Sequence, residues 1–287
     1  MRPFEYVEPK TVAEATRFLS ECGETARILA GGVDLVPRLR KDEFKADFVV
    51  NIQRIPDIAY IEAEGKKDLR FGALASLHAI ETSAAIRKQY PIFYQAVHQI
   101  TSVQAKYMGT AVGNLCVATP ASDVATVLFA LGASLGISGP AKERTVPIEA
   151  FYTGYRSTCL QRGEWVVGVT VPRPEPGTCT AFMNLARTHG DVSKVTVAVS
   201  IQAKDGLCRE ARIAIGSAAP TVFRAIKAEA SLAGKKLTAQ AIEEAAEAAA
   251  GETRPITDLR SSAEYRKDMA RVLVRRAIEK ALEQAKA

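Results

Sequence analysis

A cluster of prolines divides the sequence into two parts with different patterns. Three prolines and a glycine fall within Pro172–Gly177, and these are the residue types that most strongly interrupt helices and strands. Before this break, short apolar strands alternate with helices, whereas after it three strand-like segments precede three helices. A length of 287 residues is typical of two domains. We therefore expect an α+β protein with one domain over 1–172 and a second over 177–287.

The first part begins with a compact β-α-β unit of roughly 50 residues, which is small for a domain. Thr11 followed by Glu14 resembles a capping box at the start of a helix. The expected elements are strands 4–7, 27–30 and 48–51 with helices 11–22 and 34–39. Beyond them we expect a hairpin of strands 58–63 and 69–72, helices 76–87, 92–100 and 121–131, and strands 133–138, 143–147 and 164–171.

The second part is predicted to be a small domain with a three-stranded antiparallel sheet and a helical bundle. Apolar strand patterns and short turns predict strands over 180–187, 195–203 and 208–215. Helical spacing of apolar residues predicts helices over 221–232, 238–250 and 262–285.

Composition argues against several classes of function. The formal net charge of +6 is small and spread out, and the densest basic stretch, 254–276, also carries acidic residues, so no nucleic-acid site is expected. No apolar run reaches the ~18 residues of a membrane span, and the N-terminus lacks the apolar region of a signal peptide. A cytoplasmic location is expected. The five cysteines have no metal-site spacing, so we expect buried, reduced thiols and no metal ligands.

The first glycine-bearing loop joins a short apolar strand to a predicted helix. It comprises Leu29, Ala30, Gly31, Gly32, Val33, Asp34 and Leu35. Glycines allow close approach of the backbone to a ligand, and successive free N–H groups at such a turn can cradle a phosphate. The same residues also suit a tight turn in which Asp34 caps a helix, and the sequence pattern leaves both interpretations open.

The second glycine-bearing loop is rich in small and hydroxyl-bearing residues. It contains Thr110, Ala111, Val112, Gly113 and Asn114, and it continues through Thr119 to Asp123. Such a segment can pack against a planar ligand, and Asp123 can accept a hydrogen bond from a sugar-like hydroxyl. Alternatively, Asp123 only stabilises the start of a helix. The chain has neither the dinucleotide-binding GxGxxG fingerprint nor a P-loop.

Taken in order, the motifs of this chain resemble the FAD-binding (medium) subunits of molybdenum hydroxylases of the carbon monoxide dehydrogenase and xanthine dehydrogenase type. The resemblance extends along most of the chain and depends on the order of the motifs rather than on any single one. The matching segments are Pro3–Pro9, Leu29–Leu35, Asn51–Pro56, Gly109–Leu115, Pro120–Asp123, Arg144–Pro147, Phe151–Gly154, Gly163–Glu164, Ala186–Asp191 and Gly216–Pro220.

This resemblance implies a fold and a set of cofactor contacts. The first domain is expected to be a two-lobed FAD-binding domain of the vanillyl-alcohol-oxidase type, with lobes at about 1–52 and about 53–172. The loop 29–35 is expected to cradle the FAD pyrophosphate, and 110–114 to form a second FAD loop. Asp123 is expected to hold the ribityl or phosphate region and Val166 to lie beside the isoalloxazine. Thr119 and Asp191 complete the expected contacts.

The resemblance also implies a role in a larger complex. A molybdopterin-binding large subunit is expected to hydroxylate the substrate, and a small subunit with [2Fe-2S] clusters to pass electrons to FAD. FAD then delivers them to an external acceptor, and a dimer of heterotrimers is expected. No catalytic side chain is expected in this chain. The alternatives are a flavin-free assembly subunit and a stand-alone FAD-dependent oxidoreductase, for which His189 is the histidine nearest the site in sequence.

Three positions depart from the family pattern. Val112 occupies a place where the family usually has a glycine, which bears on how closely the backbone there can approach FAD. A lysine that relatives commonly carry near the flavin is absent at Met183–Asn184. The chain also lacks the cysteine-rich insertion of some relatives, so no iron–sulfur cluster is expected in it.

Overall fold

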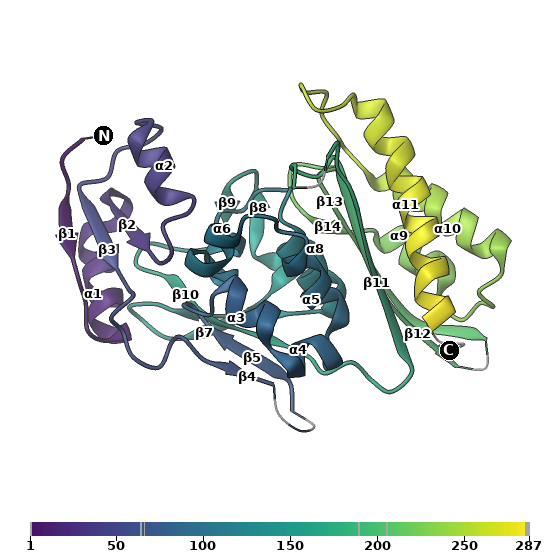
Figure 1. Ribbon diagram of the computed structural model, residues 1–287, viewed down its shortest axis with the longest axis horizontal. Coiled ribbons are helices and arrows are strands. Elements are labelled where there is room, and N and C mark those ends of the chain that lie inside the picture. The colour runs from purple at the N-terminus through teal and green to yellow at the C-terminus, as the bar shows by residue number, and fades with distance from the viewer. Residues whose placement is uncertain (1, 64, 66, 189, 205, 285–287) are drawn as a thin grey trace.

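The computed structural model describes residues 2–63, 65, 67–188, 190–204 and 206–284. Three sheets follow one another along the longest axis of the molecule (Figure 1). An N-terminal lobe lies at one end, a group of helices on a second sheet lies in the middle, and a C-terminal sheet with its own helices lies at the other end. The mixture of helix and strand agrees with the α+β expectation.

The N-terminal lobe is a three-stranded parallel sheet in the order β1-β3-β2. Its helix α1 starts as the capping box predicts, because the Thr11 side chain accepts a hydrogen bond from the N–H of Glu14 and the Glu14 carboxylate accepts one from the N–H of Lys10. The elements are β1 (Glu5–Val7), α1 (Val12–Cys22), the 3-10 turn η1 (Gly23–Thr25), β2 (Ala26–Leu29), α2 (Leu35–Arg40) and β3 (Phe48–Asn51).

The middle part is a five-stranded antiparallel sheet with helices packed on it. The strands run in the order β4-β5-β10-β6-β7 and are β4 (Ile61–Glu62), β5 (Leu69–Gly72), β6 (Ser134–Ser138), β7 (Arg144–Pro147) and β10 (Trp165–Val171). The helices are α3 (Leu77–Thr82), α4 (Ala84–Gln89), α5 (Pro91–His98), α6 (Val103–Met108), α7 (Ala111–Cys116) and α8 (Asp123–Leu131). Between β7 and β10 lie the turn η2 (Ile148–Ala150) and the hairpin β8 (Tyr152–Gly154) and β9 (Ser157–Thr158).

Three predictions for this part differ from the structure. The single helix expected over 76–87 is two helices, since Ser83 leaves the helical conformation and its side chain caps α4 instead. Strand 58–63 is regular only at Ile61–Glu62. The glycine-bearing segment after residue 108, expected to be a loop, contains the helix α7, whose start is capped by Thr110.

The C-terminal sheet has four strands, so the prediction of three is wrong. The strands β11 (Thr178–Leu185), β12 (Val195–Lys204) and β13 (Leu207–Gly216) form the expected meander, and the short β14 (Phe223–Arg224) pairs with β13. The helical pattern over 221–232 concealed this strand, because two residues are too few to show a strand period. The helices are α9 (Ile226–Leu232), α10 (Ala239–Glu252) and α11 (Ala263–Gln284), and residue 285 of the predicted last helix lies outside the described residues.

This sheet is buried on both faces, which joins the C-terminal part to the rest of the molecule. One face, with Phe182, Ala198 and Ala214, belongs to the same apolar core as the middle helices. The opposite face packs against the helices of the C-terminal part. Of these, α11 lies on β11 and β12, α9 lies on β13, and α10 packs on α9 and α11 on the side away from the sheet (Figure 1). The central strand β12 is accordingly apolar at most positions from Val195 to Ile201.

Two further observations concern the expectations about a membrane span and about the cysteines. Among the residues that the structure describes, no helix is both long and apolar enough to cross a membrane. All five cysteines are free thiols. The expectation of burial is correct for Cys179 and Cys208 and wrong for Cys116, which is exposed.

Candidate cofactor site

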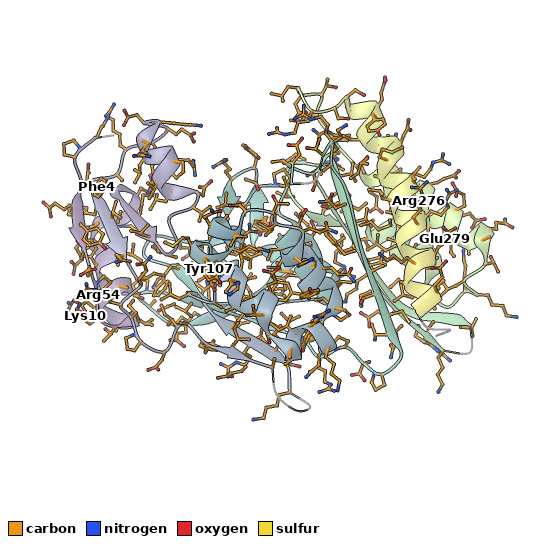
Figure 2. The ribbon with its side chains drawn as sticks, viewed as in Figure 1. Phe4, Lys10, Arg54, Tyr107, Arg276 and Glu279 are labelled. Carbon is orange, nitrogen blue, oxygen red and sulfur yellow. The ribbon has the colours of Figure 1, made fainter. Side chains whose placement is uncertain are left out.

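The two glycine-bearing loops predicted from the sequence lie in direct contact. A Cβ atom placed on Gly31 would lie 1.7 Å from the carbonyl oxygen of Met108 and 3.0 Å from the Cα of Gly109. No real Cβ tolerates such an approach, so only glycine fits at position 31. The contact joins the N-terminal lobe to the middle helices, and Figure 2 shows the neighbouring Tyr107 near the centre of the molecule.

The first loop is held by backbone and side-chain hydrogen bonds at its base. The N–H of Ile52 donates to the Leu29 carbonyl at 3.1 Å, and the Gln53 amide donates to the Ala30 carbonyl at 2.6 Å. Gly32 then has a φ of +71°, a conformation that favours glycine. The side chains of Leu29 and Leu35 pack into a small apolar cluster below the loop, whereas Val33 is 47% exposed. The backbone of residues 30–34 is therefore fixed from one side.

The second loop is held against the segment before α3. The N–H of Leu77 donates to the Gly109 carbonyl at 2.9 Å, and the N–H of Ala111 donates to the Ala75 carbonyl at 3.1 Å. The Thr110 hydroxyl accepts a hydrogen bond from the N–H of Gly113 at 2.9 Å and so begins α7. Ala111 is buried beside it.

Val112 does not need the conformational freedom of a glycine. It lies within α7, and its side chain is buried in the core with 4% exposure. Its φ is not positive. The β-branched side chain therefore points into the protein interior, and this departure from the family pattern leaves the adjoining loop surface unobstructed.

A serine that the sequence analysis did not select connects the second loop to α8. The Ser122 hydroxyl donates to the Asn114 side-chain oxygen at 2.5 Å and accepts from the N–H of Ala125, which caps α8. Thr119 lies in the preceding turn, where its carbonyl accepts from the N–H of Ser122. A serine two residues after a proline and just before an apolar helix is a capping signal that could have identified Ser122.

Asp123, the first residue of α8, faces the C-terminal sheet. Its carboxylate accepts hydrogen bonds from the Asn184 amide and from the Ser193 hydroxyl, each at 3.3 Å. Burial raises the pKa of Asp123 to about 6, although the hydrogen bonds from Ser193 and Asn184 partly offset that rise. No charged side chain contributes to this pKa shift.

Two arginines flank the carboxylate of Asp34. Arg38 lies 3.2 Å from one oxygen and Arg156 lies 3.9 Å from the other. Arg156 belongs to the turn of the β8–β9 hairpin, has a φ of +54° and donates its backbone N–H to the Ala118 carbonyl at 2.9 Å. This hairpin was not predicted, because its strands are two and three residues long.

Two predicted site residues, Val166 and Asp191, are not among the residues that link the two loops and Asp123. Val166 lies in β10 and is buried in the core, with 3% of the residue exposed. Asp191 is engaged within its own loop, where it pairs with Arg187 at 3.2 Å and accepts from the N–H of Val192. Gly190 beside it packs closely on Thr101, just before α6. His189 lies outside the described residues.

Comparison with known proteins identifies the class to which this fold and loop arrangement belong. Residues 2–174 match the family described as the FAD binding domain in molybdopterin dehydrogenase. Residues 180–281 match the CO dehydrogenase flavoprotein C-terminal domain. The chain therefore belongs to the family of FAD-binding medium subunits of molybdenum hydroxylases, which are subunits of oxidoreductases.

Individual relatives match over almost their whole length. The chain is 34% identical to the carbon monoxide dehydrogenase medium chain of Afipia carboxidovorans, covering 99% of this chain and 98% of the relative. It is 27% identical to the xanthine dehydrogenase FAD-binding subunit of Escherichia coli O157:H7, with coverage of 96% and 95%. A solved carbon monoxide dehydrogenase structure from Hydrogenophaga pseudoflava aligns with a TM-score of 0.94, 34% identity and 99% coverage of both chains.

The residues at the loop contact fit the FAD that this family binds. Gly31 and Gly109 lack side chains at the point where the two loops approach each other, and Cβ atoms there would strike backbone. In the part of the chain that the structure describes, the N–H groups of Gly31, Gly32 and Val33 have no protein acceptor, as a phosphate-binding turn requires. Among the described residues, no group of three or more His, Cys, Asp or Glu is placed to hold a metal ion.

Proposed function

We propose that this chain is the electron-transfer subunit of a molybdenum hydroxylase and holds FAD between its two glycine-bearing loops. The observation that carries the proposal is the contact of Gly31 with Met108 and Gly109, which merges two loops into one glycine-lined backbone surface. FAD, when bound, supplies the capacity to accept electrons from one partner and release them to another. The chain itself contributes binding, orientation and electrostatics.

The proposed contacts divide between backbone and side chains. The backbone of 29–35 binds the pyrophosphate and 110–114 forms a second FAD loop. The fixed base of each loop keeps these segments in place. Asp123 accepts a hydrogen bond from a ribityl hydroxyl. Val166 approaches the flavin through its backbone, since its side chain is buried. Thr119 and Asp191 contribute from the loops on either side of Asp123.

The proposed domains follow the sheets. The FAD-binding domain spans 1–172 and has the vanillyl-alcohol-oxidase fold, with one lobe at about 1–52 and the other at about 53–172. The flavoprotein C-terminal domain spans 177–287. The independent parallel sheet of the N-terminal lobe and the mixed helices and antiparallel strands of the middle part support this division.

The proposed assembly contains two partner subunits. A large subunit carries molybdopterin and performs the substrate chemistry, and a small subunit with [2Fe-2S] clusters passes electrons to FAD. The complex is a dimer of heterotrimers in the cytoplasm. Medium chains of this family that match over 95% or more of this chain support a subunit role.

The test is the visible absorption of the purified chain, alone and co-expressed with its neighbouring subunits. Bands near ~370 and ~450 nm that bleach on reduction, from a cofactor identified as FAD after acid release, are the expected result. A chain that binds no flavin even with added FAD and partners would instead be a structural assembly subunit. A chain that oxidises a substrate without partners would be a stand-alone oxidoreductase.

A further inference from the structure

The strongest unassigned feature is a polar cluster that spans the two domains beside Asp123. Asn184 is near the end of β11 and Ser193 lies just before β12, so both belong to the C-terminal domain, whereas Asp123 begins α8 of the middle part. Ser193 is 3% exposed. A side chain so well buried is normally hydrogen-bonded, and here its partners are Asn184 and Asp123.

The three side chains form a closed set of hydrogen bonds. The Asn184 amide nitrogen donates to the Ser193 hydroxyl at 2.6 Å and to one Asp123 oxygen at 3.3 Å. The Ser193 hydroxyl donates to the other Asp123 oxygen at 3.3 Å. Each carboxylate oxygen therefore has one donor from the C-terminal domain and keeps lone pairs for a further donor.

The surrounding interface keeps the two domains in register at this point. The N–H of Ser217 donates to the Pro120 carbonyl at 2.7 Å, and the hydroxyls of Thr126 and Thr196 are 3.1 Å apart in the core. A Cβ on Gly216 would lie 2.5 Å from the Thr126 hydroxyl oxygen. The position of Asp123 relative to β11 and β12 is thus fixed by close packing on both sides.

We infer that Asn184 and Ser193 are positioning residues that form a clamp on Asp123 and so complete the FAD site from the C-terminal domain. The clamp orients the carboxylate with two donors that carry no charge, and the remaining lone pairs face the cofactor. This inference rests on the proposed function, because it assumes that Asp123 contacts FAD. Without the clamp, the carboxylate can rotate, and its ionised form loses two hydrogen bonds.

The clamp has a distinctive pH signature. The pKa of Asp123, raised to about 6 by burial, is held down by the two clamp donors. If a cofactor hydroxyl donates to the carboxylate, FAD affinity is constant above pH 6 and falls as the pH drops through about 6. Removing a clamp donor raises this midpoint. No charged side chain is among the causes of this pKa shift. The elements packed on α8 and the loop before β12 carry the following charged or titratable groups: His98 on α5, Glu149 in η2, Lys204 on β12, Arg209, Glu210 and Arg212 on β13, Arg224 on β14, and Arg187, Asp191 and Lys194 in the loop.

The experiment measures the FAD dissociation constant of the full chain against pH for wild type, Asn184→Leu and Ser193→Ala. Ser193→Thr, which keeps the hydroxyl, is the conservative variant, and Ser200→Ala on β12 is the matched control. We expect each of the two disruptive variants to weaken FAD binding about tenfold, because the Asp123 carboxylate is no longer held in the orientation that accepts from the cofactor. We also expect a higher pH midpoint for both, with wild-type behaviour for the control and recovery in Ser193→Thr.

The outcomes separate this inference from the proposed function. If wild type binds FAD and both variants keep its affinity and pH midpoint, the clamp is wrong and the FAD site stands. If wild type binds no FAD, the proposed function fails and the clamp with it. Thermal melts of the cofactor-free variants identify any that fail to fold, and Ser193→Ala, which removes one atom, then decides the result.

Discussion

Gly31 lies so close to Met108 that a Cβ atom would be 1.7 Å from the Met108 carbonyl oxygen. The obstacle is backbone, which cannot move aside as the end of a flexible side chain could. We expect Gly31→Ala to force the two loops apart and to weaken FAD binding at least tenfold, measured by flavin content and titration. Gly251→Ala is the control, because nothing lies within 4 Å of a Cβ placed there and alanine suits the last turn of α10. Equal FAD affinity in both variants would contradict the loop contact.

Val112 provides a second test of the same loop. Its side chain is buried in α7, so restoring the glycine typical of the family should remove core packing and loosen the helix. We expect Val112→Gly to lower the free energy of unfolding by about 2–4 kcal/mol, measured by urea denaturation with FAD absent. FAD affinity at temperatures where the variant is folded should stay within about twofold of wild type. A large gain in affinity would show that valine obstructs the cofactor.

We expect the Asp123 carboxylate to lower the stability of the folded chain at neutral pH while it contributes to FAD binding. Because its folded pKa is raised to about 6, the folded state favours the protonated form, and this favourable contribution is lost as pH rises from about 4 to about 6. Asp123→Asn should therefore raise the melting temperature of the cofactor-free chain at pH 7.5 by a few degrees, about 1 kcal/mol. The same variant should bind FAD more weakly. A lower melting temperature together with unchanged FAD affinity would contradict both expectations.

The ion pair between Glu81 and Lys106 holds α3 against α6, just before the second loop. Lys106 lies 2.7 Å from the Glu81 carboxylate and is only 8% exposed, and His98 approaches the same oxygen at 2.8 Å. We expect Lys106→Met to cost about 1–3 kcal/mol in urea unfolding at pH 7, since the remaining carboxylate loses its closest donor. Glu62→Gln, in the exposed pair with Arg70, is the control and should cost under about 0.5 kcal/mol.

The same ion pair predicts the direction of an acid effect. Burial alone would raise the pKa of Glu81, but hydrogen bonds from Lys106 and His98 outweigh it and hold the pKa below its ordinary value of 4.5. The stabilisation is therefore complete above pH 4.5 and is lost as pH falls through the lower folded value. Glu81→Gln should have a lower free energy of unfolding than wild type at pH 7, and this difference should shrink below pH 4.5. A difference that grows below pH 4.5 would refute this assignment.

The sequence predicted most of the secondary structure because those elements are decided locally. The capping box at Thr11 and Glu14 starts a helix with contacts inside a few residues, and the apolar spacing of α8 or α10 needs no partner to be recognised. The wrong predictions of secondary structure lie where the local sequence is compatible with more than one structure. Ser83 can continue a helix or cap the next one, and the two residues of β14 become a strand only because β13 offers its edge.

The candidate site also contains residues that the local sequence could identify and residues that only the folded structure brings together. The glycines of both loops, and Asp123 at the start of a helix, could be selected from residue type and order, because close backbone approach and helix starts limit which residues fit. Ser122 has a helix-capping signature that the sequence also offers, whereas Asn184 and Ser193 carry no such local signature. These two became part of the site only through hydrogen bonds to residues distant in the chain.

The sequence by itself determined the two glycine-bearing segments, most of the longer helices and strands, and the motifs that mark the family. Only the tertiary structure decided that Gly31 meets Met108, that the Val112 side chain points into the core, and that the C-terminal sheet supplies the donors to Asp123. The physical reason is that backbone conformation depends on neighbouring residues, whereas a contact between distant segments depends on how complete apolar faces pack together.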